Sequence, residues 1–229
     1  MLFKRLVVCV LSIILVPAGF LHAQTEPSTE SFDFTICRIK YGGGGDWYSD
    51  PSSLPNLHRH VRERLGLSAP RDEVVRELTD RTLGRYPLLY MTGHGEIRFT
   101  PAEVRALREH LINGGFLWAD DNYGLDVAFR REIRRVFPET ELVLLPDDHE
   151  IFHCFYEFPD GLPAIHEHDP DIGPQALAIF HEGRMVVLFT YQSDIGDGLE
   201  DYEVHPNPPA VREAAARMAI NIIFYAMTH

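Results

Sequence analysis

The chain has 229 residues, a formal net charge of −13 at pH 7, and 45% hydrophobic side chains. A balance this acidic repels nucleic acids and anionic lipid surfaces, which excludes both as partners. It suits a soluble protein that binds small ligands or cations. Nothing in the composition identifies protein partners.

The first 23 residues have the pattern of a secretory signal peptide. Lys4 and Arg5 form a basic start, residues 6–16 are apolar, and the small residue Ala23 ends the segment. The apolar run is short for a bilayer span, although a retained membrane anchor stays open as the alternative. Removing this segment takes away two basic and no acidic side chains, so the mature chain carries −15. We expect a periplasmic or secreted protein without a stable membrane span.

Residues 24–31 are polar and are predicted to form a disordered linker, and residues 32–229 are predicted to form one domain. Hydrophobic periodicity and turn residues divide this domain into alternating strands and helices. In chain order we expect a strand at 32–41, a helix at 52–67, strands at 73–78 and 86–93, a helix at 100–113, a strand at 115–120, a helix at 127–137, a strand at 141–146, a hairpin at 176–191 turning at 181–184, and a buried helix at 209–227.

Helix ends carry the clearest local signals. Thr100, Pro101 and Glu103 match a capping box with proline at the first helical position, and Gly114 ends that helix. At the preceding helix, Ser52 or Ser53 is expected to cap the start. Alternating strands and helices predict an α/β fold: a mostly parallel sheet covered by helices on both faces, with a C-terminal β-hairpin and a buried C-terminal helix.

Polar residues follow five of the predicted strands, where a parallel sheet places its ligands. Because the carboxyl ends of parallel strands share one edge, we expect these residues to meet in a cleft. The predicted cleft residues are Gly43, Gly44, Asp46, Trp47, Tyr48, Gly93, His94, Gly95, Asp120, Asp121, Asn122, His149 and Asp194.

The four glycines at 42–45 raise the question of phosphate binding. A phosphate loop needs a nearby Lys or Arg, but these glycines precede Asp46 and Asp50, and no basic residue follows before Arg59. We therefore predict a tight turn with close backbone approach. Trp47 and Tyr48 would then either line the cleft, as suits a saccharide, or pack beneath the loop.

Several predicted cleft residues also suit a metal ion. His94, Asp121 and His149, with Asp120 beside them, offer nitrogen and oxygen ligands compatible with zinc or manganese. The structural alternatives are that His94 is only a hydrogen-bonding residue and that Asp121 caps the next helix.

Two further catalytic patterns are weak. Residues 149–153 read HEIFH, which matches the zinc-peptidase motif, but Pro146 and Pro159 leave no room for the long helix that the motif requires. No nucleophile elbow is present. Cys37 and Cys154 lie in apolar runs, and the sequence leaves open whether they form a disulfide or are separate buried thiols.

Five segments together resemble a bacterial family, domain of unknown function forty-one fifty-nine: YGGGGDWYSDPSSLPNL, YPLLYMTGHGE, NGGFLWADD, LPDDHEIFH and MAINIIFYAMTH. The resemblance covers residues 32–229. It implies a flavodoxin-like three-layer sandwich and a place in the class I glutamine-amidotransferase-like superfamily. The cysteine nucleophile of that superfamily is missing here, since Asp120 and Asp121 stand near the elbow strand, so the resemblance does not imply glutaminase activity.

Three functions follow as hypotheses. The first is binding of a small polar ligand in the strand-end cleft. The second is a metal-dependent hydrolase that uses His94, Asp120, Asp121 and His149. The third is a docking module of an envelope complex. The family resemblance supports the fold more strongly than any of these functions.

Overall fold

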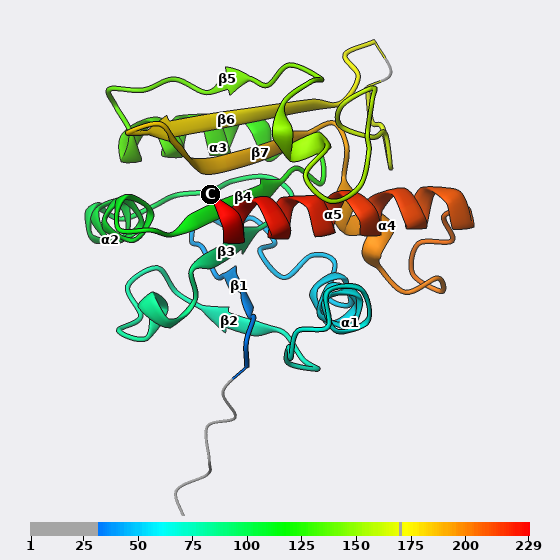
Figure 1. Ribbon diagram of the computed structural model, residues 1–229. Helices are drawn as coiled ribbons and strands as arrows, with labels where there is room; N and C mark the ends of the chain where they lie inside the picture. Colours follow the sequence, from blue (N-terminus) through cyan, green and yellow to red (C-terminus); the bar gives the residue numbers. More distant parts are fainter. Residues whose placement is uncertain (1–31, 170) are drawn as a thin grey trace, which may run out of the picture. The chain divides into compact units, whose positions relative to one another are not determined.

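The computed structural model describes residues 32–169 and 171–229, so the predicted signal peptide and linker lie outside the described residues. Seven strands form one sheet in the order β2-β1-β3-β4-β7-β6-β5 (Figure 1). Their bounds are β1 (Ile36–Ile39), β2 (Val74–Arg76), β3 (Leu88–Met91), β4 (Phe116–Asp120), β5 (Val143–Leu144), β6 (Gln175–His181) and β7 (Arg184–Tyr191).

The sheet is mixed and mostly parallel. The five strands β2, β1, β3, β4 and β7 run parallel to one another, whereas β6 is antiparallel to both β7 and β5. The predicted hairpin is thus confirmed, and it turns between His181 and Arg184. The predicted strand at 141–146 shortens to two residues at the sheet edge, where Val143 and Leu144 are exposed and have only one neighbouring strand.

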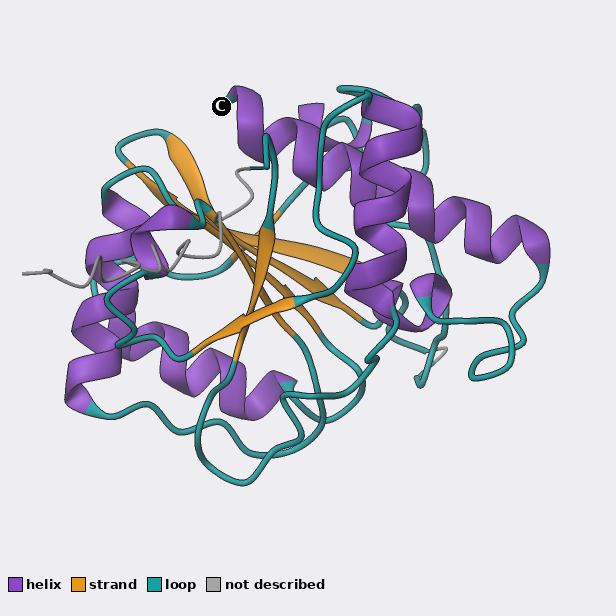
Figure 2. Ribbon diagram, turned by 90° about the horizontal axis from the view of Figure 1, so that it is seen from below, coloured by secondary structure: helices purple, strands orange, loops and turns teal. Residues whose placement is uncertain are grey.

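Helices cover both faces of the sheet, as Figure 2 shows. α1 (Ser53–Leu65), α4 (Ile195–Leu199) and α5 (Pro209–Thr228) pack together on one face. α2 (Pro101–Ile112) and α3 (Asp126–Val136) lie on the other. Two short 3₁₀ turns, η1 (Leu83–Arg85) and η2 (Glu150–Phe152), complete the described elements. The predicted α/β class with helices on both faces is confirmed.

The central strand β4 shows how the sequence builds two cores. Side chains alternate along a strand, so Phe116 and Trp118 join the core beneath α1 and α5, while Leu117 and Ala119 join the core beneath α2 and α3. All four are buried, which explains why the strand reads as a continuous apolar run instead of an alternating one.

Helix caps confirm one prediction and correct another. At α2, Thr100 accepts a hydrogen bond from the Glu103 backbone N–H and Glu103 reciprocates, as the capping box requires. At α1, Ser52 occupies the cap position, but its side chain does not cap the helix. Instead, Glu200 Oε1 accepts from the N–H groups of Ser52 (2.8 Å) and Ser53 (2.9 Å). A carboxylate from the distant α4 region performs this role because a helix N-terminus attracts negative charge.

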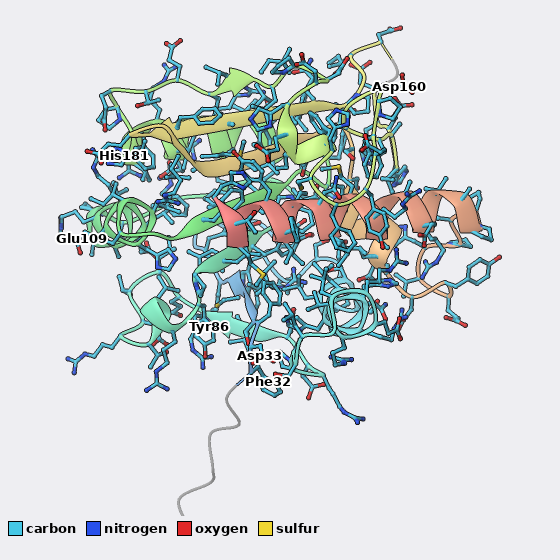
Figure 3. All side chains as sticks on the ribbon, viewed as in Figure 1. Phe32, Asp33, Tyr86, Glu109, Asp160 and His181 are labelled. Atoms are coloured by element: carbon cyan, nitrogen blue, oxygen red, sulfur yellow. The ribbon has the colours of Figure 1, made fainter. Side chains whose placement is uncertain are left out.

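The start of the described chain is tied to the loop after α1. Phe32 and Asp33, labelled in Figure 3, lie there, and Asp33 Oδ2 accepts from Ser68 N (3.0 Å) and Ser68 Oγ (2.8 Å). At the other end, α5 is buried over much of its length, as predicted. Within the described part of the chain, no helix has the length and hydropathy to span a bilayer.

Candidate functional site

The loops after β1 and β3 pack directly on each other. Gly45 N donates to the Glu96 carbonyl at 2.9 Å, and Asp46 N contacts the His94 carbonyl. Gly43 has φ +114°, and a Cβ there would lie 2.6 Å from Arg98 N, so only glycine fits. The glycines therefore allow the backbone of this turn to approach the backbone of the loop after β3 closely, as predicted. That loop carries His94.

His94 is held by Asp46. Its ring Nδ1 lies 3.0 Å from Asp46 Oδ2, and its backbone N–H donates to Asp46 Oδ1. The His94 side chain is 48% exposed. The pair is thus oriented by the loop contact yet open to solvent at the edge of the sheet.

Asn122 links three of the strand ends. It accepts from Thr92 Oγ1 at 2.6 Å, and its Nδ2 donates to Asp50 Oδ1 at 2.8 Å and to Ser49 Oγ at 3.0 Å. Burial raises the pKa of Asp50 to about 6, and Asp197 and Glu200 raise it further, whereas the Asn122 bond opposes the shift. A neutral amide, and no cationic side chain, bonds this buried carboxylate.

Asp120 lies fully buried at the end of β4. Its Oδ2 accepts from Gly196 N at 2.7 Å, and its Oδ1 accepts from Thr190 Oγ1. Burial raises the pKa of Asp120 to about 7, against the lowering effect of these hydrogen bonds. Asp120 thereby joins β4 to β7 and to the start of α4.

Asp121 contributes to the turn before α3 but does not cap that helix, whose cap position is Leu125. Its Oδ1 accepts from Leu125 N at 2.9 Å, immediately before α3, so it fixes the turn into that helix. Burial raises its pKa to about 6. The charge of His94 acts in the opposite direction and lowers the pKa of Asp121.

The densest group of ionisable side chains lies on the other side of Asp120. Asp197 Oδ2 is 2.5 Å from His166 Nδ1, and Asp197 Oδ1 is 3.1 Å from His205 Nε2. His168 Nε2 is 3.3 Å from Asp194 Oδ2. The carboxylates are nearly inaccessible, while the His166 ring is 47% exposed, so solvent reaches the acids through the imidazoles.

Backbone hydrogen bonds hold these histidines in place. Ile165 N and His166 N both donate to the Ser193 carbonyl, at 3.2 and 2.9 Å. Gln192 Oε1 accepts from His168 N and Asp169 N. The loop residues 165–169 are therefore anchored beside the end of β7.

Asp194 has an unusual backbone. It adopts the left-handed conformation at φ +55°, as does Gln192 at φ +58°. Such conformations cost about 1–3 kcal/mol in a non-glycine residue and are concentrated at functional sites. Burial and the neighbouring Asp197 raise the pKa of Asp194 well above its usual range.

We refer to these residues together as the strand-end site: Asp50, Asp120, Asn122, His166, His168, Asp194, Asp197 and His205. Two buried polar atoms beside it have no hydrogen-bond partner, the Tyr90 hydroxyl and Glu200 Oε2. A Cβ on Gly196 would contact both the Tyr90 hydroxyl and Asp50 Oδ2, which places that hydroxyl next to the carboxylates. Buried polar groups are normally bonded, so these atoms indicate unfilled binding capacity.

Other predicted site residues lie elsewhere or play structural parts. His149 starts the 3₁₀ turn η2, and its ring packs near Phe180 (6.3 Å) and Tyr225 (5.6 Å). Among the described residues, no group of three potential metal ligands within 4.8 Å includes His149, His94 or Asp121. Trp47 packs partly buried on the core beneath α2 and α3, while Tyr48 is exposed.

The zinc-peptidase motif at 149–153 is not on a long helix, as predicted from its flanking prolines. Only Glu150–Phe152 is helical, and it forms a 3₁₀ turn. His153 instead pairs with Glu157, 2.7 Å away. The cysteines are free, and burial raises the pKa of Cys37 to about 12 and of Cys154 to about 11, so neither is a reactive thiol.

A surface pocket lies apart from the ionisable cluster. A pocket of about 500 Å³ lies among residues around Leu78, His110 and Gly115. It contains no group of three potential metal ligands among the described residues. We base the site on the converging carboxylates and imidazoles, since polar convergence is what distinguishes a binding site from a surface hollow.

The three histidines of the strand-end site were missed by sequence reasoning. His166 and His168 alternate in HEH within a long loop, and His205 lies beyond α4. The usable signal was the HEH spacing together with the acidic run after β7, which contains Asp194 and Asp197.

Comparison with known proteins identifies the family but not the chemistry. The family model described as "Domain of unknown function (DUF4159)" matches residues 35–227. A methionine import ATP-binding protein, MetN, of Vibrio cholerae serotype O1 is 27% identical over 103 residues. That match covers 45% of this chain and 30% of the Vibrio protein, so the chain spans under a third of that relative.

Proposed function

Because the chain belongs to the family described as a domain of unknown function (DUF4159), we propose its function from the strand-end site: it binds a small polar ligand there, such as a saccharide. We further propose that it is exported, that residues 1–23 are a cleaved signal peptide, and that the fold belongs to the glutamine-amidotransferase-like superfamily without the cysteine nucleophile. The acidic charge of the chain supports a soluble, nucleic-acid-free setting.

One observation carries the binding proposal: the site is rich in buried acceptors and poor in cations. Asp50, Asp120 and Asp194 are at most 5% exposed. Among the described residues, no Lys or Arg side chain forms an ion pair with any of the three. A ligand with several hydroxyl or amino donors would satisfy these acceptors.

The rim adds an apolar surface suited to a sugar ring. Tyr123 is exposed, and its ring lies 4.7 Å from that of His168. An aromatic face beside hydrogen-bonding carboxylates is the arrangement that polar, partly apolar ligands require. Tyr48 adds a second exposed aromatic side chain, in the loop after β1.

Thermal-shift screening against glycans and polar metabolites tests this proposal, with calorimetry on each positive compound. Asp50→Asn should weaken binding by at least about tenfold, because a hydrogen bond to a charged group contributes roughly 1.5–3 kcal/mol. The matched control is Glu63→Gln, an exposed residue of α1, which should bind as the wild type does. A panel that never shifts the melting temperature, or equal affinity in Asp50→Asn, would contradict the proposal.

Metal-dependent hydrolysis is the second candidate. Imidazoles adjacent to buried carboxylates favour it, since a bound ion would activate water without a Ser or Cys nucleophile. Hydrolysis of chromogenic esters and glycosides, with and without added divalent ions, tests this candidate. Hydrolytic activity that persists after chelation of divalent ions would argue against this candidate.

A further inference from the structure

We propose that His166, His168 and Asp194 bind one divalent transition-metal ion as a cofactor. This inference rests on the proposed function, because the ion would occupy the same strand-end site. The three residues each offer one ligand atom, and these atoms lie within 4.8 Å of one another. None of them was among the metal ligands expected from the sequence, and only Asp194 was among the predicted cleft residues.

The donor set selects the class of ion. Two imidazole nitrogens and one carboxylate oxygen suit borderline ions such as Zn²⁺, Mn²⁺ or Fe²⁺, whereas Ca²⁺ and Mg²⁺ prefer oxygen ligands alone. Three protein ligands also leave coordination positions open for water or a substrate. The partial exposure of the imidazoles gives an ion and a ligand a path from solvent.

Asp197 supports the same assignment because it contacts the ring of His166. Its carboxylate is 2.5 Å from His166 Nδ1, which leaves Nε2 of that ring for the ion. Histidine ligands commonly direct their second ring nitrogen to a carboxylate that fixes the ring orientation. Asp197 is in turn held by His205, 3.1 Å away. We infer that Asp197 is a positioning residue and not a ligand.

Independent support comes from the unpartnered atoms beside the group. The Tyr90 hydroxyl and Glu200 Oε2 are fully buried without hydrogen bonds, and the Tyr90 hydroxyl lies next to Asp50, which has no Lys or Arg ion-pair partner among the described residues. Burying several acids and leaving polar atoms unbonded is costly unless a bound species compensates. A divalent ion with its bound water supplies both positive charge and hydrogen-bonding groups.

The test uses the full protein, purified without a polyhistidine tag, stripped with a chelator and titrated with Zn²⁺ by calorimetry. We expect one ion per chain, and Co²⁺ should bind with visible absorption bands typical of nitrogen and oxygen ligands. His168→Ala should weaken Zn²⁺ binding by more than about a hundredfold. Asp197→Asn should weaken it about 10–100-fold, as is usual for a residue that orients a ligand.

Two matched controls accompany these variants. His153→Ala removes a histidine that pairs with Glu157 outside the site, so Zn²⁺ affinity should not change. His205→Ala should reduce affinity by no more than about tenfold. Circular dichroism verifies folding, and His168→Asn replaces any His168→Ala protein that does not fold. Unchanged affinity in folded His168 variants overturns the assignment, as does complete loss in His205→Ala alone, which would indicate the alternative group His166, Asp197 and His205.

Different experimental results would contradict the metal assignment and the proposed ligand-binding function. Zn²⁺ titration contains no organic ligand, so an absence of Zn²⁺ binding overturns only the metal inference. Repeating the glycan screen on stripped protein completes the separation: a glycan that binds equally well without metal supports the binding function while removing the ion from it. Selective Ca²⁺ binding in place of Zn²⁺ would likewise overturn the choice of His166 and His168 as ligands.

Discussion

Two buried carboxylate regions of this protein are built in opposite ways. Glu132 on α3 has a side chain only 3% exposed, yet two arginines surround it. Arg131 Nε lies 2.9 Å away, Arg135 forms a close ion pair, and Phe99 N donates at 3.0 Å. Although burial opposes it, these groups hold the pKa of Glu132 below its usual range.

The strand-end site buries its acids without such neutralisation. Asp120 and Asp50 bond to hydroxyl, amide and backbone groups, and burial raises their pKa to about 7 and about 6. The nearest buried cation, Arg38, donates to the backbone carbonyls of Ser49 and Asp50 and pairs with Glu73. Its charge thus organises the loop without forming an ion pair with the site carboxylates.

The difference separates acids that stabilise the fold from acids that, in our proposal, bind a ligand. A buried carboxylate that the chain itself neutralises contributes to folding, whereas one left without a cation makes the fold less stable until something binds. Removing a carboxylate from each region should therefore change stability in opposite directions, which is the basis of the following predictions.

The largest effect is expected at Glu132. Glu132→Ala leaves Phe99 N and two guanidiniums without their acceptor, so the free energy of unfolding should fall by about 3 kcal/mol. Urea denaturation at pH 7 measures it. The control Glu139→Ala breaks an exposed pair with Arg108 and should cost less than about 1 kcal/mol. Equal losses in the two variants would show that burial of Glu132 does not matter.

Asp120→Asn should have the opposite effect and increase the free energy of unfolding. The amide can still accept from Gly196 N and can donate to Thr190 Oγ1, while the buried charge is gone. We expect the metal-free protein to gain about 2 kcal/mol at pH 8. The gain is smaller than the raised pKa of Asp120 alone would suggest, since the amide bonds are weaker than those of a carboxylate.

The pH dependence of that gain follows from the raised pKa. Between pH 4 and 7 the native state keeps the Asp120 proton that the unfolded state, with a pKa near 3.8, has lost. Wild-type stability therefore decreases as pH rises through this window, and the advantage of Asp120→Asn should shrink toward pH 4. Asp148→Asn, an exposed substitution, is the control. If Asp120→Asn lost stability at every pH, Asp120 would stabilise the fold as Glu132 does, and the contrast between the two regions would be wrong.

Sequence reasoning predicted the fold because the signals were local. The capping box at Thr100, the apolar run of β4 and the hairpin turn depend on neighbouring residues, and each appears as expected. The edge strand β5 was predicted too long because its apolar run lacks a second neighbouring strand. The glycine turn, His94 and Asp120 follow the neighbouring parallel strands β1, β3 and β4, whose carboxyl ends share one edge of the sheet.

The remainder of the site depended on contacts that no local pattern contains. His166 reaches the site because its backbone N–H bonds to Ser193, and that pairing of a loop with a distant strand end is not encoded in a period or motif. His149 follows a strand end as the others do, but the chain turns at once into η2 and carries the ring toward Phe180 and Tyr225. Whether a residue belongs to the site therefore depends less on its position after a strand than on the direction of the turn that follows.

Glu200 gives the smallest and most discriminating prediction, because it bonds the start of α1 and also lies beside the strand-end site. Oε1 caps α1 through Ser52 N and Ser53 N, while Oε2 is buried without a partner. Glu200→Gln keeps a carbonyl for both N–H groups and removes only the charge, so the loss of helix-dipole stabilisation should be about 1 kcal/mol or less. Relief of repulsion with Asp50 offsets part of it, since Glu200 helps to raise the pKa of Asp50.

Glu200→Ala provides the comparison for that variant, because it also leaves the two backbone N–H groups unbonded and should cost roughly 2 kcal/mol more. Urea denaturation of both variants, with an NMR titration of the Asp50 carboxyl, separates the hydrogen bonds from the charge. If Gln and Ala cost the same, the charge of Glu200 and not its acceptor geometry stabilises α1. Glu200 would then resemble Glu132, with the helix N-terminus in the place of the arginines.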